Sequence, residues 1–458
     1  GKTCNREKTL ISIFKAYDIR GLVDVEITAD FCFATGVAFA RFLQQEREPG
    51  TVVIGEDMRP SSPIFAEAFS AGVTSQGLNV IRIGLASTDM LYFAAGKLNF
   101  PGAMFTASHN PAEYNGIKLC LSGARPIGKE SGLLTIERFV NDGSPIDFRS
   151  VGNERNRDML NEYVDHLLTL VDLNDIRPLK IVIDAGNGMA GHTAPAVFAR
   201  LNCEVIPMYY ELDGSFPNHE ANPIDPKNLK DLQKAVKKHK ADIGLAFDGD
   251  ADRCFLVDES GELVNPSTLT ALIAARELAK NPGANIIYNL ISSRAVVEIV
   301  EESGGKAIRS RVGHSYIKKL MADTGAVFGG EHSGHFYFKD FWHADSGMLA
   351  ALHAIAALGE VGAPLSKILK PYCRYVASGE INSEVLDAQS SMNEIAEKFG
   401  ESAGNEVDHL DGLTVNGDTW WFNVRASNTE PLLRLNVEAK TQARMEKIRD
   451  EVLATIRG

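Results

Sequence analysis

Three segments of this chain share one order of elements: a short apolar run, a loop with glycine or polar residues, and a helical pattern. They are TVVIGEDMRPSSPIFAEAF from residue 51, KIVIDAGNGMAGHTAPAVFARL from residue 180 and NIIYNLISSRAVVEIVEESG from residue 285. The apolar runs do not alternate cleanly with polar residues, which is typical of strands in a sheet that helices cover on both faces. The segments therefore predict three α/β domains of related build.

The last 90 residues follow a different pattern. YCRYVASGEI, DGLTVNGD, WWFNVRAS and LLRLNVEA resemble strands, Asn416–Gly417 suits a hairpin turn, and QARMEKIRDEVLATI has the periodicity of an amphipathic helix. This segment predicts a C-terminal α+β domain. Polar or proline-bearing joins place the four domains at residues 1–150, 151–257, 258–369 and 370–458. The segment 366–374 is the candidate hinge.

Net charge and composition exclude some classes of partner. With 47 basic and 60 acidic residues among 458, the formal charge of −13 opposes attraction to nucleic acid or an anionic membrane. No apolar run approaches the length of a membrane span and the first residues lack a secretory signal, so we expect a cytoplasmic protein. The six cysteines occur singly, which predicts reduced thiols rather than a zinc site or disulfides.

The stretch GAMFTASHNPAEYNGIK, residues 102–118, follows an apolar run and is rich in polar and turn-forming residues. One interpretation is an ordinary surface loop, because Ser, Asn, Gly and Pro dominate turns for conformational reasons. The other is a nucleophilic serine, Ser108, held on a loop beside His109 and Lys118.

A second unusual stretch, IGLAFDGDADR at residues 243–253, ends an apolar strand in Asp248, Asp250 and Asp252. Carboxylates this close repel one another unless a cation is present, and hard oxygen ligands suit Mg²⁺. The alternative is a solvated acidic turn. The position favours the metal, since open α/β sheets bind ligands at the carboxyl ends of their strands.

Two further loops carry polar groups suited to a phosphorylated sugar. FGGEHSGHFYF, residues 328–338, places Glu331 and Ser333 between glycines, which suits recognition of hydroxyls, although a glycine-rich hairpin turn would explain it equally well. VRASNTEPLLRL, residues 424–435, offers the planar donor fork of Arg425 for a phosphate, although it also could be an ordinary turn.

The set of four motifs, one in each expected domain and in this order, is far more specific than any one of them. Together with FKAYDIRG at residues 14–21, it resembles the α-D-phosphohexomutase superfamily, and most closely its bacterial phosphomannomutase/phosphoglucomutase branch, over essentially the whole chain. The resemblance implies three related α/β domains and a mobile α+β domain around a central cleft. It also implies that Ser108 is phosphorylated in the active enzyme.

Carried over position by position, the resemblance implies a role for each of these residues. The predicted Mg²⁺ ligands are Asp248, Asp250, Asp252 and a phosphate oxygen on Ser108. The predicted catalytic residues are Ser108, Arg20, Lys118 and Arg253, with His109, His314 and His335 as alternatives for positioning groups or moving protons. The predicted substrate-binding residues are Tyr17, Glu331, Ser333, Arg425, Ser427, Asn428, Thr429 and Arg434.

The implied activity is reversible phosphoryl transfer between the 1- and 6-positions of mannose or glucose phosphates, through a phosphoserine and a hexose 1,6-bisphosphate that also serves as activator. Small hexose phosphates would be the partners of a monomer or small homo-oligomer. One alternative is a phosphoglucosamine mutase, but enzymes of that kind carry a different residue at the position of His332. A phosphatase with Asp248 as nucleophile would need Thr or Val at Ala251 and leaves the other loops unexplained. A non-catalytic sugar-phosphate-binding relative would need neither the serine nor the acidic triplet.

Overall fold

The computed structural model describes residues 12–142, 150–427 and 430–458. The described residues within 1–264 and 334–365 form one compact unit, and those within 265–333 and 366–458 form the other. Among the described residues, no single helix is both long and apolar enough to cross a membrane, and only one bent helix pair passes that test by length and composition. The described cysteines are all free, and only Cys373 is exposed.

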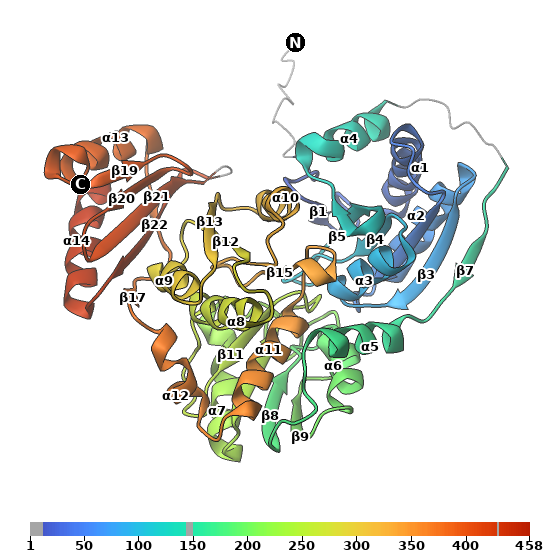
Figure 1. The fold of residues 1–458 in the computed structure, drawn as a ribbon. Helices are drawn as coiled ribbons and strands as arrows, with labels where there is room; N and C mark the ends of the chain where they lie inside the picture. Colours follow the sequence, from blue (N-terminus) through green and yellow to red (C-terminus); the bar gives the residue numbers. More distant parts are fainter. Residues whose placement is uncertain (1–11, 143–149, 428–429) are drawn as a thin grey trace, which may run out of the picture. The chain divides into compact units, whose positions relative to one another are not determined.

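A seven-stranded sheet opens the first unit (Figure 1). Its strands are β1 (Ile19–Leu22), β2 (Thr51–Glu56), β3 (Asn79–Leu85), β4 (Gly102–Phe105), β5 (Tyr114–Leu121), β6 (Arg125–Pro126) and β7 (Glu154–Asn156). The order is β1-β5-β4-β2-β3-β7, with β6 beside β5. β2 runs parallel to β3 and β4, whereas β5 runs antiparallel to β4. The chain therefore reverses direction just after the carboxyl end of β4.

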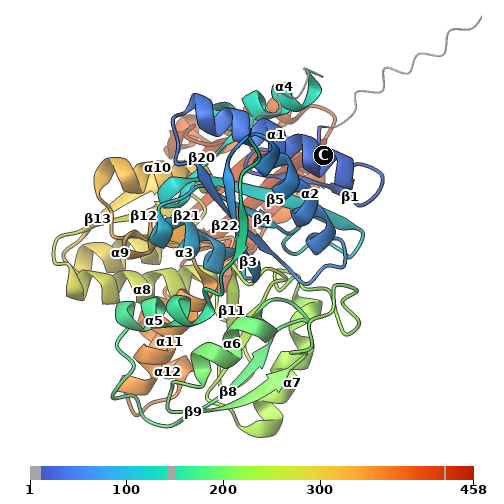
Figure 2. The same ribbon diagram turned by 90° about the vertical axis from the view of Figure 1, so that its right-hand side faces the viewer.

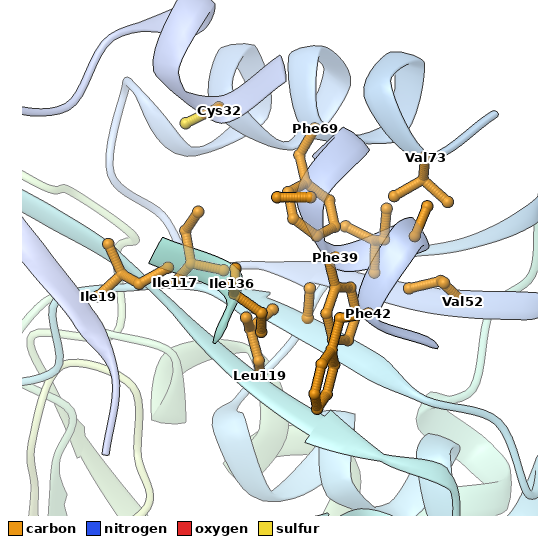
Figure 3. Close-up of a cluster of buried hydrophobic side chains, with 14 of the residues drawn as sticks. Ile19, Cys32, Phe39, Phe42, Val52, Phe69, Val73, Ile117, Leu119 and Ile136 are labelled. Atoms are coloured by element: carbon orange, nitrogen blue, oxygen red, sulfur yellow. The ribbon is translucent and has the colours of Figure 1, made fainter. Parts of the chain in front are cut away.

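Helices α1 (Ala29–Gln45), α2 (Ser62–Ser75) and α4 (Leu134–Asn141) pack over this sheet, and α3 (Thr88–Leu98) contacts β2 and β4. The core between α1, α2 and the sheet contains phenylalanine rings packed among aliphatic side chains (Figure 3). Phe39 of α1 and Phe69 of α2 have ring centroids 5.9 Å apart, and Ile117 and Leu119 of β5 lie in the same buried cluster. Burying such side chains contributes about 1.5–3 kcal/mol each.

The second sheet of this unit has the order β11-β10-β8-β9. Its strands are β8 (Leu179–Asp184), β9 (Cys203–Met208), β10 (Ile243–Phe247) and β11 (Cys254–Val257), and its helices are α5 (Leu160–Leu170), α6 (Ala190–Phe198) and α7 (Lys230–His239). Figure 2 shows β8 and β9 with α6 and α7 beside them. β10 is parallel to β8 and antiparallel to β11, so the chain reverses after β10 as it does after β4. The unit also contains β15 (Phe336–Phe338), β16 (Ala344–Asp345) and the buried helix α11 (Gly347–Glu360).

The second unit contains two groups of elements. The first has the parallel strands β12 (Asn285–Asn289), β13 (Lys306–Ser310) and β14 (Phe328–Gly330), with helices α8 (Pro266–Lys280), α9 (Arg294–Glu302) and α10 (His314–Thr324). A short helix, α12 (Leu365–Leu369), precedes the second group. The strand–loop–helix segments predicted at residues 51, 180 and 285 are β2–α2, β8–α6 and β12–α9, so the α/β prediction is confirmed.

The C-terminal group is a six-stranded antiparallel sheet with two helices. Its elements are β17 (Val376–Ala377), β18 (Ile381–Glu384), α13 (Ala388–Phe399), β19 (Glu406–Asp408), β20 (Leu413–Asn416), β21 (Trp420–Ala426), β22 (Leu432–Ala439) and α14 (Gln442–Arg457). Phe422 and Val424 face a buried cluster with α13 and α14, while the alternate residues of β21 face the other way. The predicted hairpin is confirmed, because Gly417 N donates to Trp420 O at 2.9 Å between β20 and β21.

Candidate active site

Ser108 lies just beyond the end of β4 in an unusual backbone conformation. Its φ of 53° is in the left-handed region, which costs free energy for a residue other than glycine. The hydroxyl of Thr106 stabilises the turn by accepting a hydrogen bond from Ser108 N at 3.0 Å. The residue is 4% exposed, so this serine is not part of an ordinary solvated surface loop.

The three aspartates follow β10 and meet the serine. Asp248, Asp250 and Asp252 are buried, and each offers an oxygen within 4.8 Å of the others. Ser108 Oγ lies 3.1 Å from Asp250 Oδ1 and 3.4 Å from Asp248 Oδ2. Gly249 allows this approach, because a Cβ there would lie 2.3 Å from Ser108 O. Two loops that the sequence singled out separately therefore form one site.

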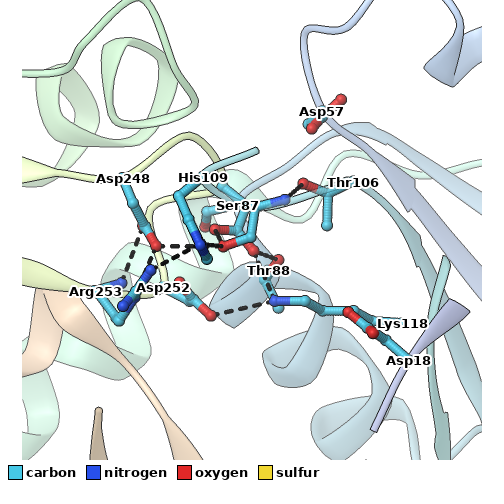
Figure 4. Close-up of polar contacts among 12 residues, drawn as sticks. Asp18, Asp57, Ser87, Thr88, Thr106, His109, Lys118, Asp248, Asp252 and Arg253 are labelled. Carbon is cyan, nitrogen blue, oxygen red and sulfur yellow. Dashed lines mark hydrogen bonds and ion pairs between the residues drawn. The ribbon is translucent and has the colours of Figure 1, made fainter. Parts of the chain in front are cut away.

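Positive side chains surround this site (Figure 4). Lys118 Nζ lies 2.9 Å from Asp250 Oδ2 and 3.2 Å from Asp252 Oδ2. Arg253 Nε lies 3.0 Å from Asp248 Oδ2, and Arg20 donates to Asn110 Oδ1 in the serine loop at 2.7 Å. Three predicted cations thus lie in contact with the serine loop or the acidic triplet.

The electrostatics of the triplet favour a bound cation. Burial, with the charges of Asp252 and Asp250, raises the pKa of Asp248 well above its ordinary value. Burial acts to raise the pKa of Asp252, but the Lys118 ammonium, His335 and a hydrogen bond with Asp248 together outweigh it, and the pKa falls below its usual range. Asp252 Oδ1 is buried and accepts no hydrogen bond from the described residues. A divalent cation would supply the missing partner, so the residues fit a metal ion.

The predicted histidines lie in different places. His109 Nδ1 lies 2.9 Å from Arg253 Nη2 and 3.4 Å from Ser108 Oγ. Burial, with the Arg253 and Arg20 charges, lowers the pKa of His109 to about 3, so its imidazole is neutral. Nδ1 accepts from the guanidinium, which leaves the proton on Nε2. His335 Nε2 lies 4.0 Å from Asp252 Oδ2, whereas His314 is the first residue of α10 in the second unit.

Sequence reasoning missed Arg59, which fixes the shape of the serine loop. Its Nε donates to Asp57 Oδ2 at 3.2 Å, and its four terminal N–H groups donate to main-chain carbonyls at 2.8–3.2 Å. Those carbonyls belong to Ser108, Asn110, Pro111 and Tyr114. All five donors of a buried guanidinium are used. The available signal was an acidic and a basic residue directly after the apolar strand β2.

Thr88 and Asp89 at the start of α3 were also missed. The Thr88 hydroxyl donates to Asp250 Oδ2 at 2.6 Å and its N–H donates to Asp250 O at 3.0 Å. Asp89 is fully buried and accepts hydrogen bonds from the hydroxyls of Ser87, Tyr163 and Ser346. Burial raises the pKa of Asp89 to about 6. No sequence motif indicates a functional role for either residue.

The other predicted substrate-binding residues are distributed over both units. Tyr17 is half-buried in the turn before β1. In the second unit, Glu331 Oε2 lies 3.4 Å from Gly313 N, and Ser333 follows in the same loop after β14. Arg425 and Arg434 are paired across β21 and β22, and Ser427 Oγ accepts from Glu430 N at 3.3 Å. Asn428 and Thr429 lie outside the described residues.

Comparisons with known proteins cover nearly the whole chain. Models of phosphoglucomutase/phosphomannomutase α/β/α domains I, II and III match residues 12–145, 161–261 and 265–375, and the C-terminal domain of that family matches residues 380–455. Phosphohexose mutases of Xanthomonas campestris pv. campestris are 40% identical over 445 residues, covering 97% of this chain and 98% of theirs. A phosphomannomutase of Escherichia coli K12 is 38% identical over 455 residues, covering 97% and 99%.

A solved structure agrees with these relatives. The crystal structure of a phosphoglucomutase/phosphomannomutase family protein from Burkholderia thailandensis has a TM-score of 0.88 and 33% identity, with 97% of each chain covered. Fold and relatives together define an isomerase of the phosphohexomutase class. The chain belongs to the phosphoglucomutase/phosphomannomutase family.

Proposed function

We propose that this phosphohexomutase carries its phosphoryl group on Ser108 and moves it between the 1- and 6-positions of mannose and glucose phosphates. The observation that carries the proposal is Ser108 Oγ, 3.1 Å from Asp250 and 3.4 Å from Asp248 and His109. The hydroxyl oxygen of Ser108 lies beside two carboxylates of the acidic triplet, so a phosphate on it would need positive charge nearby. This arrangement suits a phosphate carrier whose charge is balanced by a cation and by basic side chains.

In the proposed cycle, the phosphoryl group leaves Ser108 Oγ for the free hydroxyl of a hexose 1- or 6-phosphate. The P–O bond to serine breaks as the bond to the sugar oxygen forms, and the proton of the sugar hydroxyl ends on Ser108 Oγ. The resulting 1,6-bisphosphate turns end for end, and its other phosphate returns to Ser108 in the reverse step. The same bisphosphate would activate dephosphorylated enzyme.

The chain's own residues would bind and neutralise the transferring group. Lys118 and Arg253 already contact the triplet, and Arg20 contacts the serine loop, so their charges lie where the equatorial oxygens of the phosphoryl group gain charge. Neutral His109 holds its Nδ1 toward Arg253 and Ser108 and would orient both. His335 is the better placed of the other two histidines for moving a proton near Asp252.

Asp248, Asp250 and Asp252 would hold Mg²⁺, because hard carboxylate oxygens suit that ion. When bound, the ion would supply positive charge to the phosphate oxygens. His335 and Asp345 form a second group with Asp252, with ligand atoms within 4.8 Å of one another. The nitrogen of His335 makes that group the poorer match for Mg²⁺.

Mass spectrometry and kinetics of Ser108→Ala test the proposal. Intact wild-type protein should carry one phosphate that is stable to acid and hydroxylamine, mapped to Ser108, and the variant should lose the phosphate and nearly all turnover. A phosphate released by hydroxylamine would indicate an acyl phosphate on Asp248 and a phosphatase-like mechanism instead. Full turnover by Ser108→Ala would overturn the proposal.

A further inference from the structure

The strands β21 and β22 carry two arginines whose Nε donors have no hydrogen-bond acceptor among the described residues. Arg425 and Arg434 lie opposite each other across these strands. Each has a buried Nε that meets no acceptor among the described residues. Two adjacent guanidinium groups repel one another, and burial lowers the pKa of Arg425. The pair therefore has unused donors for an anion with several acceptor oxygens, such as a phosphate.

One carboxylate already lies at this site. Glu380, the residue before β18, places Oε1 3.2 Å from Arg425 Nη2. The side chain of Arg425 is 11% exposed, whereas that of Glu380 is 40% exposed. Glu380 makes no other hydrogen bond or ion pair among the described residues, so little holds it in place except Arg425.

Asp411, which lies in the turn before β20, provides a comparison. Its charge also acts on Arg425, but its Oδ2 accepts from Val312 N at 3.1 Å and its carbonyl accepts from Asn423 Nδ2 at 2.9 Å. Asp411 is therefore fixed by the main chain, whereas Glu380 is free to leave. Of the two carboxylates near Arg425, only Glu380 can be exchanged for an incoming anion without breaking another contact.

We propose that Glu380 is a built-in competitor for the substrate's phosphate, which must displace this carboxylate from Arg425 in order to bind. The inference rests on the proposed function, because it takes the anion at Arg425 to be a hexose phosphate. A phosphate carries close to two charges and three acceptor oxygens, so it outcompetes one carboxylate. When Glu380 returns, it shields Arg425 and favours release. This prevents overly tight binding at a site that must let go of the bisphosphate before it can turn.

Equilibrium binding of glucose 6-phosphate tests this, measured by calorimetry on full-length protein with EDTA present to prevent turnover. Glu380→Gln keeps the size of the side chain and removes its charge, so it should tighten binding about three- to fivefold, as expected for loss of one partly exposed ion pair. In kinetic assays KM should fall by a similar factor. Glu384→Gln removes the same charge from the exposed end of β18 and should leave the affinity within about twofold of wild type.

Measurements in an Arg425→Ala variant distinguish the effect of Glu380 from the effect of losing the phosphate-binding arginine. Arg425→Ala alone should weaken binding at least tenfold, and adding Glu380→Gln to it should change nothing further. Unchanged or weaker binding by Glu380→Gln, with Arg425→Ala weakened as expected, would overturn the competitor while leaving the proposed function in place. Wild-type affinity in Arg425→Ala would show that the phosphate binds elsewhere, and would overturn both the role of this loop and the competitor.

Discussion

The guanidinium of Arg59 donates to the main-chain carbonyl of Ser108 at 3.2 Å. The same side chain holds three more carbonyls of the loop and the carboxylate of Asp57, so one residue fixes the path of the chain on both sides of the serine. The strained φ of Ser108 persists because this network determines it from several directions.

Arg59→Lys should therefore impair catalysis more than substrate binding. An ammonium keeps the charge beside Asp57 but has three donors instead of five, so the loop would relax and Ser108 would move. A displacement of about 1 Å costs about 100-fold in rate, and we expect kcat to fall by about that factor with KM nearly unchanged. Steady-state kinetics check this. Arg82→Lys, which changes a partly exposed arginine of β3 paired with Glu56 and Glu154, is the matched control and should retain kcat.

Asp250→Asn should weaken Mg²⁺ binding and lower turnover. The change removes one charge from the triplet but keeps an oxygen for the Thr88 hydroxyl and the Lys118 ammonium. We expect at least a tenfold loss of Mg²⁺ affinity in a titration after EDTA treatment, with kcat reduced far more than KM is raised. Asp242→Asn, at the other end of β10, should behave as wild type. A fall in kcat matched by an equal rise in KM would instead indicate a folding defect.

Asp89 should make the folded protein more stable in mild acid than in neutral solution. Its pKa is about 6 in the folded protein against an ordinary value of 3.8, so the native state binds the proton more tightly. The contribution is fully present below pH 3.8 and is lost as the pH rises through about 6; the difference corresponds to about 3 kcal/mol. Asp89→Asn should raise the free energy of unfolding at pH 7.5 and change it much less at pH 4.5. Urea unfolding at both pH values measures this, and equal destabilisation at both would contradict it.

Mannose 1-phosphate and glucose 1-phosphate should both be turned over. The two sugars differ only in the orientation of the C2 hydroxyl. Turning the intermediate over moves C2 to a different side of the binding site, so no single fixed donor can recognise that hydroxyl in both orientations. Steric differences alone allow discrimination of about 10- to 200-fold in kcat/KM. A panel of hexose phosphates with bisphosphate activator measures the ratio. A value beyond about 10⁴ would show that a residue reads C2, and activity on glucosamine phosphate alone would favour the amino-sugar branch.

The sequence predicted the parts of the site that follow buried strands. Ser108 after β4 and the triplet after β10 lie at the carboxyl ends of parallel strands, where chemistry is expected from pattern alone. Their meeting at 3.1 Å could not be read from spacing, because 142 residues separate Ser108 from Asp250. It depends on how two sheets pack.

The supporting residues were beyond sequence reasoning for a different reason. Arg59 binds carbonyl groups, which every residue carries, so no side-chain pattern identifies its partners. Glu380 precedes a short strand among ordinary polar neighbours, and only the register of β18 on β22 brings it to Arg425. Contacts set by strand order and register are properties of the fold rather than of a motif.

The approach of Gly249 to the carbonyl of Ser108 limits how such an enzyme can arise by recombination of gene segments. The first sheet carries the serine and the second carries the acidic triplet, so a fragment with either sheet alone would hold only half of the proposed carrier and metal site. Any new pairing of a serine loop with an acidic loop would also need glycine at position 249, because a side chain there would clash with the Ser108 carbonyl. Exchange of both sheets together would keep this contact, whereas exchange of a single domain between distant relatives would have to rebuild it first.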